Sequence, residues 1–190
     1  PSILKADDQE ESGIAQMSFF SEEQDNIDYK IVDTEAKFEE MISVIKTKSG
    51  FSFDTETTSI NPMNCELVGI SFSVDTGKGW YIPISHKDGT QLSKNSVLSR
   101  LSPIFSDTTT PVRAHNANYD ITVLQENGIF VGGLEFDTMI AAHVAGGRNW
   151  GLKDLALDRF GHEMTPITEL IGSGKNQITM AEVSIEKAAK

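Results

Sequence analysis

The sequence predicts a mixed α/β domain, and two features of the 190-residue chain support that fold class. Three apolar, β-type runs follow one another and are joined by turn residues, which indicates an antiparallel meander. Beyond them, helical and strand-like segments alternate, as they do where parallel strands extend a sheet. The hydrophobic content of 38% and charged content of 23% are ordinary for a globular domain of this length.

The first 28 residues are predicted to form an acidic linker or tail in front of the domain, which then spans residues 29–190. These first residues carry eight acidic side chains against Lys5 alone, a net charge of −7, without sustained periodicity. The rest of the chain carries the remaining −5 of a formal net charge of −12. Acidity of this degree argues against binding nucleic acid by bulk electrostatics, so any such binding is expected to be modest and metal-dependent.

The first half of the domain is expected to contain a strand, a helix and the meander. The strand covers residues 29–32, and Asp33 or Thr34 caps a helix that stops before Gly50. Apolar residues of this helix recur at i, i+3, i+4 and i+7, namely Phe38, Met41, Ile42 and Ile45. Hairpin-type turns then separate three strands, at residues 51–56, 67–74 and 79–84.

The second half is expected to alternate between helix and strand. The expected elements are a helix at 93–105, a strand at 111–116, a helix ending near Gly128, a strand at 134–137 and helices at 138–144, 151–160 and 180–190. In the helix at 151–160, the residues expected to face inward are Leu152, Leu155, Ala156 and Phe160. Thr179 is expected to cap the last helix. This order of elements fits an RNase H-like topology.

Two carboxylates end the strand at residues 51–56. Side chains alternate along a strand, so Asp54 and Glu56 project to one face while Phe51, Phe53 and Thr55 project to the other. Two anions on one face repel each other, and burying both is costly unless a cation lies between them. Mg²⁺ or Mn²⁺ with oxygen ligands would suit such a site. Taken alone, however, an Asp-x-Glu pattern more often marks a strand that ends in solvated charges.

A second polar group follows the strand at residues 111–116. Asn116 and Tyr119 lie at a strand-to-helix junction, and Asp120 falls in the first turn of the helix, from where it can point towards Asp54. Taken alone, an acid in a first helical turn usually complements the helix dipole, and an Asn before it usually serves a turn.

Together these segments resemble the 3′–5′ exonuclease domain of bacterial DNA polymerase I enzymes, members of the four-carboxylate exonuclease superfamily with an RNase H-like fold. The resemblance starts with the Phe-x-Phe-Asp-Thr-Glu-Thr strand, the meander and the His-Asn-x-Asn-Tyr-Asp junction. It continues through the short runs at residues 67–72, 81–86, 136–139, 152–156 and 174–179. It therefore spans residue 29 to the end of the chain.

The resemblance implies a role for each matching residue. Asp54 would bridge two divalent cations, Mg²⁺ or Mn²⁺, Glu56 would ligate one and help to position the attacking water, and Asp120 would be the third acidic ligand. The reaction would release nucleoside 5′-monophosphates from single-stranded 3′ ends. Thr57 and Ile60 would contact the terminal nucleotide. Asn116 and Tyr119 would contact the substrate strand or orient the ligands.

The sequence departs from the family pattern at the third motif, Tyr-x-x-x-Asp, which supplies the fourth carboxylate. The preceding blocks place this motif beyond Lys190, and no tyrosine follows Tyr119. Either the chain is cut before this motif, the interpretation preferred here, or the site is degenerate. The chain alone is then expected to bind the second cation weakly and to hydrolyse poorly. Of the other acids, Asp137 is interpreted as structural, and Asp154 and Asp158 as part of a solvated helix face.

Three functions remain open at this stage. The preferred one is a proofreading exonuclease that acts on the 3′ end of single-stranded DNA, as a monomer in the cytoplasm, with a polymerase domain following in the same parent chain. The second is an RNA-trimming exonuclease of the same superfamily. The third is a non-catalytic structural domain, which the retention of Asp54, Glu56 and Asp120 disfavours. No apolar run approaches the ~20 residues of a membrane span, so no membrane association is expected.

Overall fold

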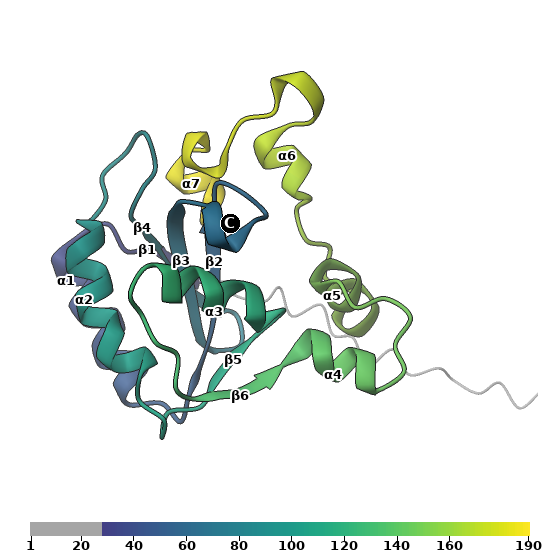
Figure 1. Cartoon of the computed structure of the whole chain (residues 1–190), viewed down its shortest axis with the longest axis horizontal. Helices are drawn as coiled ribbons and strands as arrows, with labels where there is room; N and C mark the ends of the chain where they lie inside the picture. The colour runs from purple at the N-terminus through teal and green to yellow at the C-terminus, as the bar shows by residue number, and fades with distance from the viewer. Residues whose placement is uncertain (1–27) are drawn as a thin grey trace, which may run out of the picture.

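The computed structural model describes residues 28–190, which form one six-stranded mixed sheet flanked by helices (Figure 1). The expected acidic tail lies outside the described residues, except for Asp28, which begins the first strand. The strand order is β1-β4-β3-β2-β5-β6. β2, β3 and β4 are antiparallel neighbours, and the pairs β1–β4, β2–β5 and β5–β6 are parallel. The predicted meander and the mixed α/β fold class are therefore confirmed.

The observed bounds follow the sequence pattern closely through the first two thirds of the chain. The strands are β1 (Asp28–Ile31), β2 (Phe51–Thr57), β3 (Leu67–Asp75), β4 (Lys78–Pro83), β5 (Val112–Ala114) and β6 (Leu134–Asp137). The helices are α1 (Glu35–Lys46), α2 (Lys94–Phe105), α3 (Ala117–Glu126), α4 (Thr138–Val144), α5 (Leu152–Phe160), α6 (Ile167–Ile171) and α7 (Ile185–Ala188). Short 3₁₀ turns are η1 (Pro62–Asn64), η2 (Gly174–Asn176) and η3 (Met180–Glu182).

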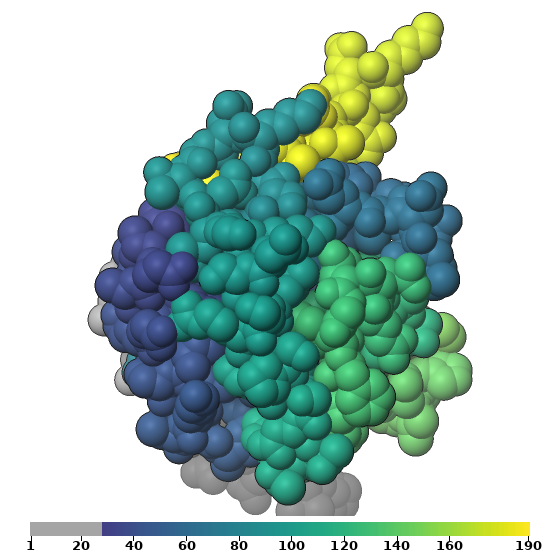
Figure 2. Space-filling view, turned by 60° about the vertical axis from the view of Figure 1, so that its left-hand side comes forward, coloured from purple at the N-terminus to yellow at the C-terminus, as the bar shows by residue number. Residues whose placement is uncertain are grey.

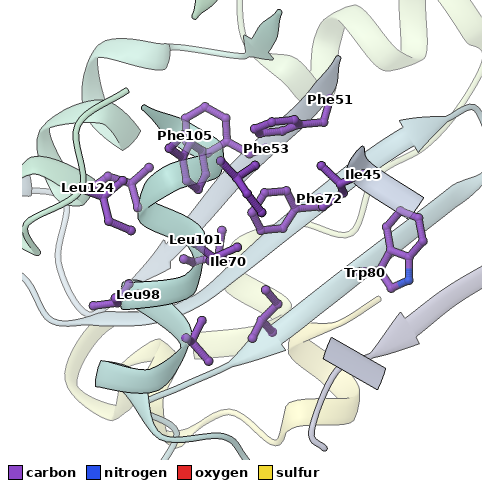
Figure 3. Packing of buried hydrophobic residues seen from close by; sticks show 14 of the residues in the cluster. Ile45, Phe51, Phe53, Ile70, Phe72, Trp80, Leu98, Leu101, Phe105 and Leu124 are labelled. Atoms are coloured by element: carbon purple, nitrogen blue, oxygen red, sulfur yellow. The ribbon is translucent and has the colours of Figure 1, made fainter. Parts of the chain in front are cut away.

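The main hydrophobic core lies on one face of the sheet, beneath α1, α2 and α3. The alternation of β2 places Phe51 and Phe53 on this face, where both are buried. Phe105, at the end of α2, meets both rings edge-on at 5.5 and 5.0 Å between centroids, and Phe72 of β3 joins the same group (Figure 3). Aromatic packing therefore fixes the strand that carries the first two carboxylates.

Within residues 28–190, the opposite face of the sheet is open and holds a groove with a volume of about 550 Å³. Its floor contains polar side chains of β2 and β3, including Ser52, Asp54, Glu56 and Ser71, which alternate with the core residues of these strands. The rim is apolar where Leu152 and Met164 approach it. The one sheet thus has a helix-covered face that stabilises it and an open face that is available for chemistry.

The last third of the chain departs from the predicted pattern. The expected helix at 180–190 is wrong: two short turns, η3 and α7, stand there, with Thr179 capping the first through a capping box with Glu182. Val183 interrupts the helix because its side chain packs in a small cluster with Val68 and Met180 instead of continuing the turn. In the space-filling view the yellow part of the chain, towards its C-terminus, projects at the top (Figure 2).

The expected inward face of the helix at 151–160 is also wrong. The helix forms as α5, but it has no buried residue, and the side chains of Leu152 and Phe160 are 43% and 78% exposed. α5 lies beside the sheet rather than over the core (Figure 1), so Leu155 and Ala156 are only half-buried. α6 follows it and was not expected from the sequence. None of the helices in the described part of the chain is both long and apolar enough to cross a membrane.

Candidate active site

β2 places its two carboxylates side by side on the open face of the sheet. Phe51, Phe53 and Thr55 are buried on the core side, as expected, while Asp54 and Glu56 border the groove. Across the ladder Asp54 pairs with Ser71 and Glu56 pairs with Gly69, and the register shifts immediately after Glu56. Irregularities of this kind often re-aim side chains at the end of a strand next to a functional site.

The third carboxylate approaches the end of β2 from α3, on the helix-covered side of the strand. Because β2 and β5 are parallel, their carboxyl ends meet at one edge of the sheet, and α3 begins just after β5. Asp120, in the first turn of α3, is only 2% exposed. Its Oδ1 accepts hydrogen bonds from the Thr55 backbone N–H at 2.9 Å and from the Thr55 hydroxyl at 2.5 Å. Asp120 therefore does point to the end of β2, as the sequence suggested.

Burial raises the pKa of all three carboxylates, and repulsion between the charges adds to the shift at Asp54 and Glu56. Loss of hydration, then the charge of Asp120 and then that of Glu56 raise the pKa of Asp54 to about 8. Loss of hydration followed by the Asp120 charge raises the pKa of Glu56 to about 7. Burial also raises the pKa of Asp120, although the Thr55 hydrogen bonds oppose the shift. The ion pairs formed among residues 28–190 involve other side chains.

This set of ligands fits a hard divalent cation, although the side chains are not yet arranged around one. Oxygen ligands with excess negative charge are what Mg²⁺ and Mn²⁺ prefer. Within residues 28–190, no three His, Cys, Asp or Glu side chains stand together in coordinating positions. One Asp120 oxygen is engaged by Thr55, on the helix-covered side of β2. Asp54, Glu56 and Asp120 would hold the metal after side-chain rotation.

The repulsion predicts a stability that falls with pH and that Mg²⁺ restores. Asp54 and Glu56 hold protons more tightly in the folded chain than the ordinary values near 4 in the unfolded chain. Stability should therefore fall as pH rises from about 4 to about 8, because the folded state binds more protons over that range. Mg²⁺ should raise the melting midpoint by at least about 2 °C at pH 8, and by less at pH 5.

Differential scanning fluorimetry in Mg²⁺ and in EDTA checks this prediction. Asp54→Asn removes one charge with little change of shape, so it should raise the midpoint in EDTA at pH 8 and reduce the response to Mg²⁺. Asp158→Asn, at an exposed position on α5, is the matched control and should change neither. An equal Mg²⁺ response at both pH values, or one that Asp54→Asn leaves intact, would contradict the role of this cluster.

Two of the four residues expected to contact substrate, Thr57 and Tyr119, join β2 to α3 next to the carboxylates. The Thr57 Oγ1 and Tyr119 Oη atoms are 2.5 Å apart, so the end of β2 and the start of α3 are joined beside Asp120. Ile60 lies in the loop between β2 and β3 and is 96% exposed, which leaves it free to meet a base. Asn116 is exposed and adopts a left-handed backbone conformation with φ 60°. Their roles in binding stay predictions.

Asp137 has a role that the sequence pattern alone did not reveal. Its two carboxylate oxygens accept from the backbone N–H groups of Asn116 and Ala117, at 3.2 and 2.8 Å, and of Met139 and Ile140, at 2.8 and 3.2 Å. It therefore joins the start of α3 to the start of α4 and holds the left-handed turn before Asp120. Its interpretation as a structural acid agrees with these contacts. Its position between a predicted strand and a predicted helix is the feature of the sequence that could have indicated this capping role.

Asp137→Ala is expected to destabilise the fold by about 2 kcal/mol or more, since a lost cap alone costs up to about that amount. Burial acting alone would raise the pKa of Asp137, but the backbone hydrogen bonds outweigh it and hold the pKa below its ordinary value. This contribution should be present above pH 4 and lost as pH falls further. Urea unfolding at pH 7 and pH 3 measures both effects. A decrease in the free energy of unfolding below 0.5 kcal/mol would contradict the stabilising role of the Asp137 hydrogen bonds.

The model of the 3′–5′ exonuclease family matches residues 29–189. The chain belongs to the 3′–5′ exonuclease family of DNA polymerase I. A DNA polymerase I of Chloroflexus aurantiacus is 43% identical over 152 residues, which cover 79% of this chain and 16% of that polymerase. The chain thus spans only a small part of this relative, and it is an exonuclease domain of the DNA polymerase I type.

Solved structures agree on the fold of the exonuclease domain. The EXO domain of Aedes aegypti Nibbler is 13% identical with a TM-score of 0.62, covering 85% of this chain and 79% of that one. Brucella melitensis NrnC with bound Mg²⁺ is 18% identical with a TM-score of 0.52, covering 73% and 63%. Both are similar in architecture, and the RNase H-like fold expected for the exonuclease domain is confirmed.

Proposed function

We propose that the exonuclease domain removes nucleotides one at a time from the 3′ end of single-stranded DNA, using two divalent cations, Mg²⁺ or Mn²⁺, held by Asp54, Glu56 and Asp120. The observation that carries this proposal is the meeting of three mutually repelling carboxylates at the carboxyl ends of β2 and β5. Such cations supply the positive charge that stabilises the phosphorane-like transition state and the leaving 3′ oxygen.

The chain's own residues prepare the site for that charge. Thr55 holds one Asp120 oxygen through two hydrogen bonds, which keeps the carboxylate at the end of β2. Glu56 borders the groove, where its carboxylate would ligate a cation and help to position the attacking water. The joined hydroxyls of Thr57 and Tyr119 close one side of the site.

The groove on the open face suits an unpaired strand. Its floor offers serine hydroxyls and its rim carries apolar side chains, including Phe136, which is 48% exposed. Bases stack on exposed aromatic and apolar side chains without regard to sequence. We assign contacts with the terminal nucleotide to Thr57 and Ile60, and contacts with the strand to Asn116 and Tyr119. A paired end would have to open before its last phosphodiester could reach Asp54.

The setting of the domain is part of the same proposal. Residues 29–190 form the exonuclease domain behind a linker at residues 1–28, and a polymerase domain lies in the same protein, as in the Chloroflexus relative. The fourth carboxylate that the four-carboxylate resemblance implies would come from a segment outside residues 28–190. The protein would act as a monomer in the bacterial cytoplasm. The longest natural form of the protein should therefore degrade DNA faster than the 190-residue chain.

The test is degradation of 5′-labelled oligonucleotides with single-stranded 3′ tails, made of DNA or of RNA, in Mg²⁺, in Mn²⁺ and in EDTA. Shortening of the DNA from its 3′ end with release of 5′-mononucleotides, in metal only, supports the proposal. Faster shortening of RNA would replace it by an RNA-trimming function. No shortening of either by the longest natural form would leave a non-catalytic domain.

A further inference from the structure

Tyr81 lies on the open face of the sheet beside the carboxylates and has no role in the reaction described so far. Asp54 of β2, Ser71 of β3 and Tyr81 of β4 are successive partners across the ladder, so their side chains share a face. Tyr81 is 4% exposed, and it borders the groove together with Glu56. The position of this buried phenol beside a carboxylate suggests that Tyr81 acts on Glu56.

Gly69 explains how the phenol reaches Glu56. Gly69 is the direct partner of Glu56 in the antiparallel ladder, where opposed Cβ atoms normally lie about 5 Å apart. A Cβ built on Gly69 would lie 2.2 Å from the Tyr81 hydroxyl oxygen and 2.4 Å from Cζ, so the ring occupies the space of the missing side chain. The Tyr81 hydroxyl is therefore the cross-strand neighbour of Glu56. Consistently, burial and then the charge of Glu56 raise the pKa of Tyr81.

His86 fixes the direction of that hydroxyl. The imidazole is 5% exposed, with Nδ1 2.9 Å from the Val183 carbonyl oxygen and Nε2 2.6 Å from the Tyr81 hydroxyl. A carbonyl oxygen only accepts, so Nδ1 carries the proton and Nε2 accepts the hydroxyl proton of Tyr81. Gln91 holds the backbone of His86 through two further hydrogen bonds, at 2.9 and 2.8 Å. Both ring nitrogens of His86, together with its backbone N–H and carbonyl, are thus engaged in hydrogen bonds.

Through His86 the phenol is linked to the C-terminal segment, residues 179–185. This segment packs Met180 and Val183 against Val68 of β3 and accepts the backbone N–H of Lys87 at the Ala181 carbonyl, at 2.8 Å. Val68 is the neighbour of Gly69 in β3. The docking of the segment, the orientation of His86 and the position of the phenol therefore depend on one another.

We propose that Tyr81 is a positioning residue for Glu56, and that His86 holds the Tyr81 ring against Glu56 by joining it to Val183 of the C-terminal segment. The ring limits the rotation of Glu56 on the side of Gly69 and leaves its carboxylate directed to Asp54 and Asp120. The inference rests on the proposed function, because the position of Glu56 would affect the affinity for the cations that Glu56 would ligate.

The test measures Mn²⁺ binding by electron paramagnetic resonance of the free ion, in Tyr81→Phe, His86→Phe and the double variant of the 190-residue chain. Residues that orient a metal ligand affect affinity by about tenfold or more, so each single variant should raise the Mn²⁺ dissociation constant by about tenfold. The double variant should be no weaker than the weaker single variant, because both changes break one link. His143→Phe, at an exposed histidine, is the matched control and should bind as the parent does.

Exonuclease kinetics of the same variants in the longest natural form provide a second readout. A positioning role predicts a lower kcat with an unchanged KM, whereas general loosening of the fold would also lower the metal-free melting midpoint. Parental Mn²⁺ affinity in a folded Tyr81→Phe chain would overturn the inference and leave the proposed function standing. A parent chain that binds no Mn²⁺, or binds it equally well after Asp54→Ala, would overturn both.

Discussion

Asp54→Ala is expected to lower kcat for 3′-end hydrolysis by about 10³-fold or more. A metal ion at a reacting phosphate contributes several kcal/mol to the transition state, and each 1.4 kcal/mol corresponds to a factor of ten in rate. Burial, then the charge of Asp120 and then that of Glu56 raise the pKa of Asp54, so Asp54 is close to both of the other acids. The substitution therefore removes the carboxylate that would share cations with both Glu56 and Asp120.

The fold should survive this substitution, which makes the loss of rate interpretable. Removing one of three repelling carboxylates relieves the metal-free site, so the melting midpoint in EDTA should stay level or rise. Asp158→Ala, the same change at an exposed position on α5, should leave the rate within twofold of the parent. Rates within tenfold of the parent for Asp54→Ala, measured by single-turnover release of 5′-mononucleotides, would be incompatible with a metal-ligating Asp54.

Phe105→Ala should have the largest effect on stability, about 3–5 kcal/mol, as expected for a truncated buried phenylalanine. Phe105 is fully buried and contacts Phe51, Phe53 and Phe72, with ring centroids 5.0–5.6 Å apart. A loss of this size is a large fraction of the total stability of a domain and should lower the melting midpoint by about 10 °C. Because Phe51 and Phe53 alternate with the residues of the groove, the site should lose order first.

Phe160→Ala is the control for this prediction. Phe160 is 78% exposed on α5, so the same truncation should change the free energy of unfolding by less than about 0.5 kcal/mol. Urea denaturation at 25 °C compares the two variants. A loss below 1 kcal/mol for Phe105→Ala would show that the aromatic group does not hold the sheet, whereas comparable losses in both variants would show that α5 packs against the core in solution.

Most of the sheet and two of the carboxylates could be predicted because strand alternation is a local property. The pattern from Phe51 to Glu56 places aromatic rings on one face and acids on the other without reference to the rest of the chain. The proximity of Asp120 needed one further step, the parallel pairing of β2 and β5, which the order of elements provides. The resemblance to polymerase exonucleases then supplied the roles, several of which stay predictions.

The features that could not be predicted depend on contacts between distant segments. The hydrogen bonds of Asp137 to Asn116 and Ala117, and the contact of Tyr81 with Gly69, exist only once strands are paired, so no window of sequence contains them. The helix expected at 180–190 fails for the same reason. Its apolar residues follow a helical spacing, but Val183 is drawn to Val68, 115 residues earlier in the chain. Tertiary packing overrode local propensity at these sites.

The central claim is that Asp54, Glu56 and Asp120 together hold divalent cations. Anomalous diffraction from crystals grown with Mn²⁺ and a nucleoside 5′-monophosphate tests it most directly. The expected result is a strong peak in contact with Asp54, and a second peak about 3.5–4 Å away when the longest natural form is used. Both peaks should be lost in Asp54→Asn crystals. Mn²⁺ peaks elsewhere on the molecule, with none within bonding distance of these three carboxylates, would contradict the account.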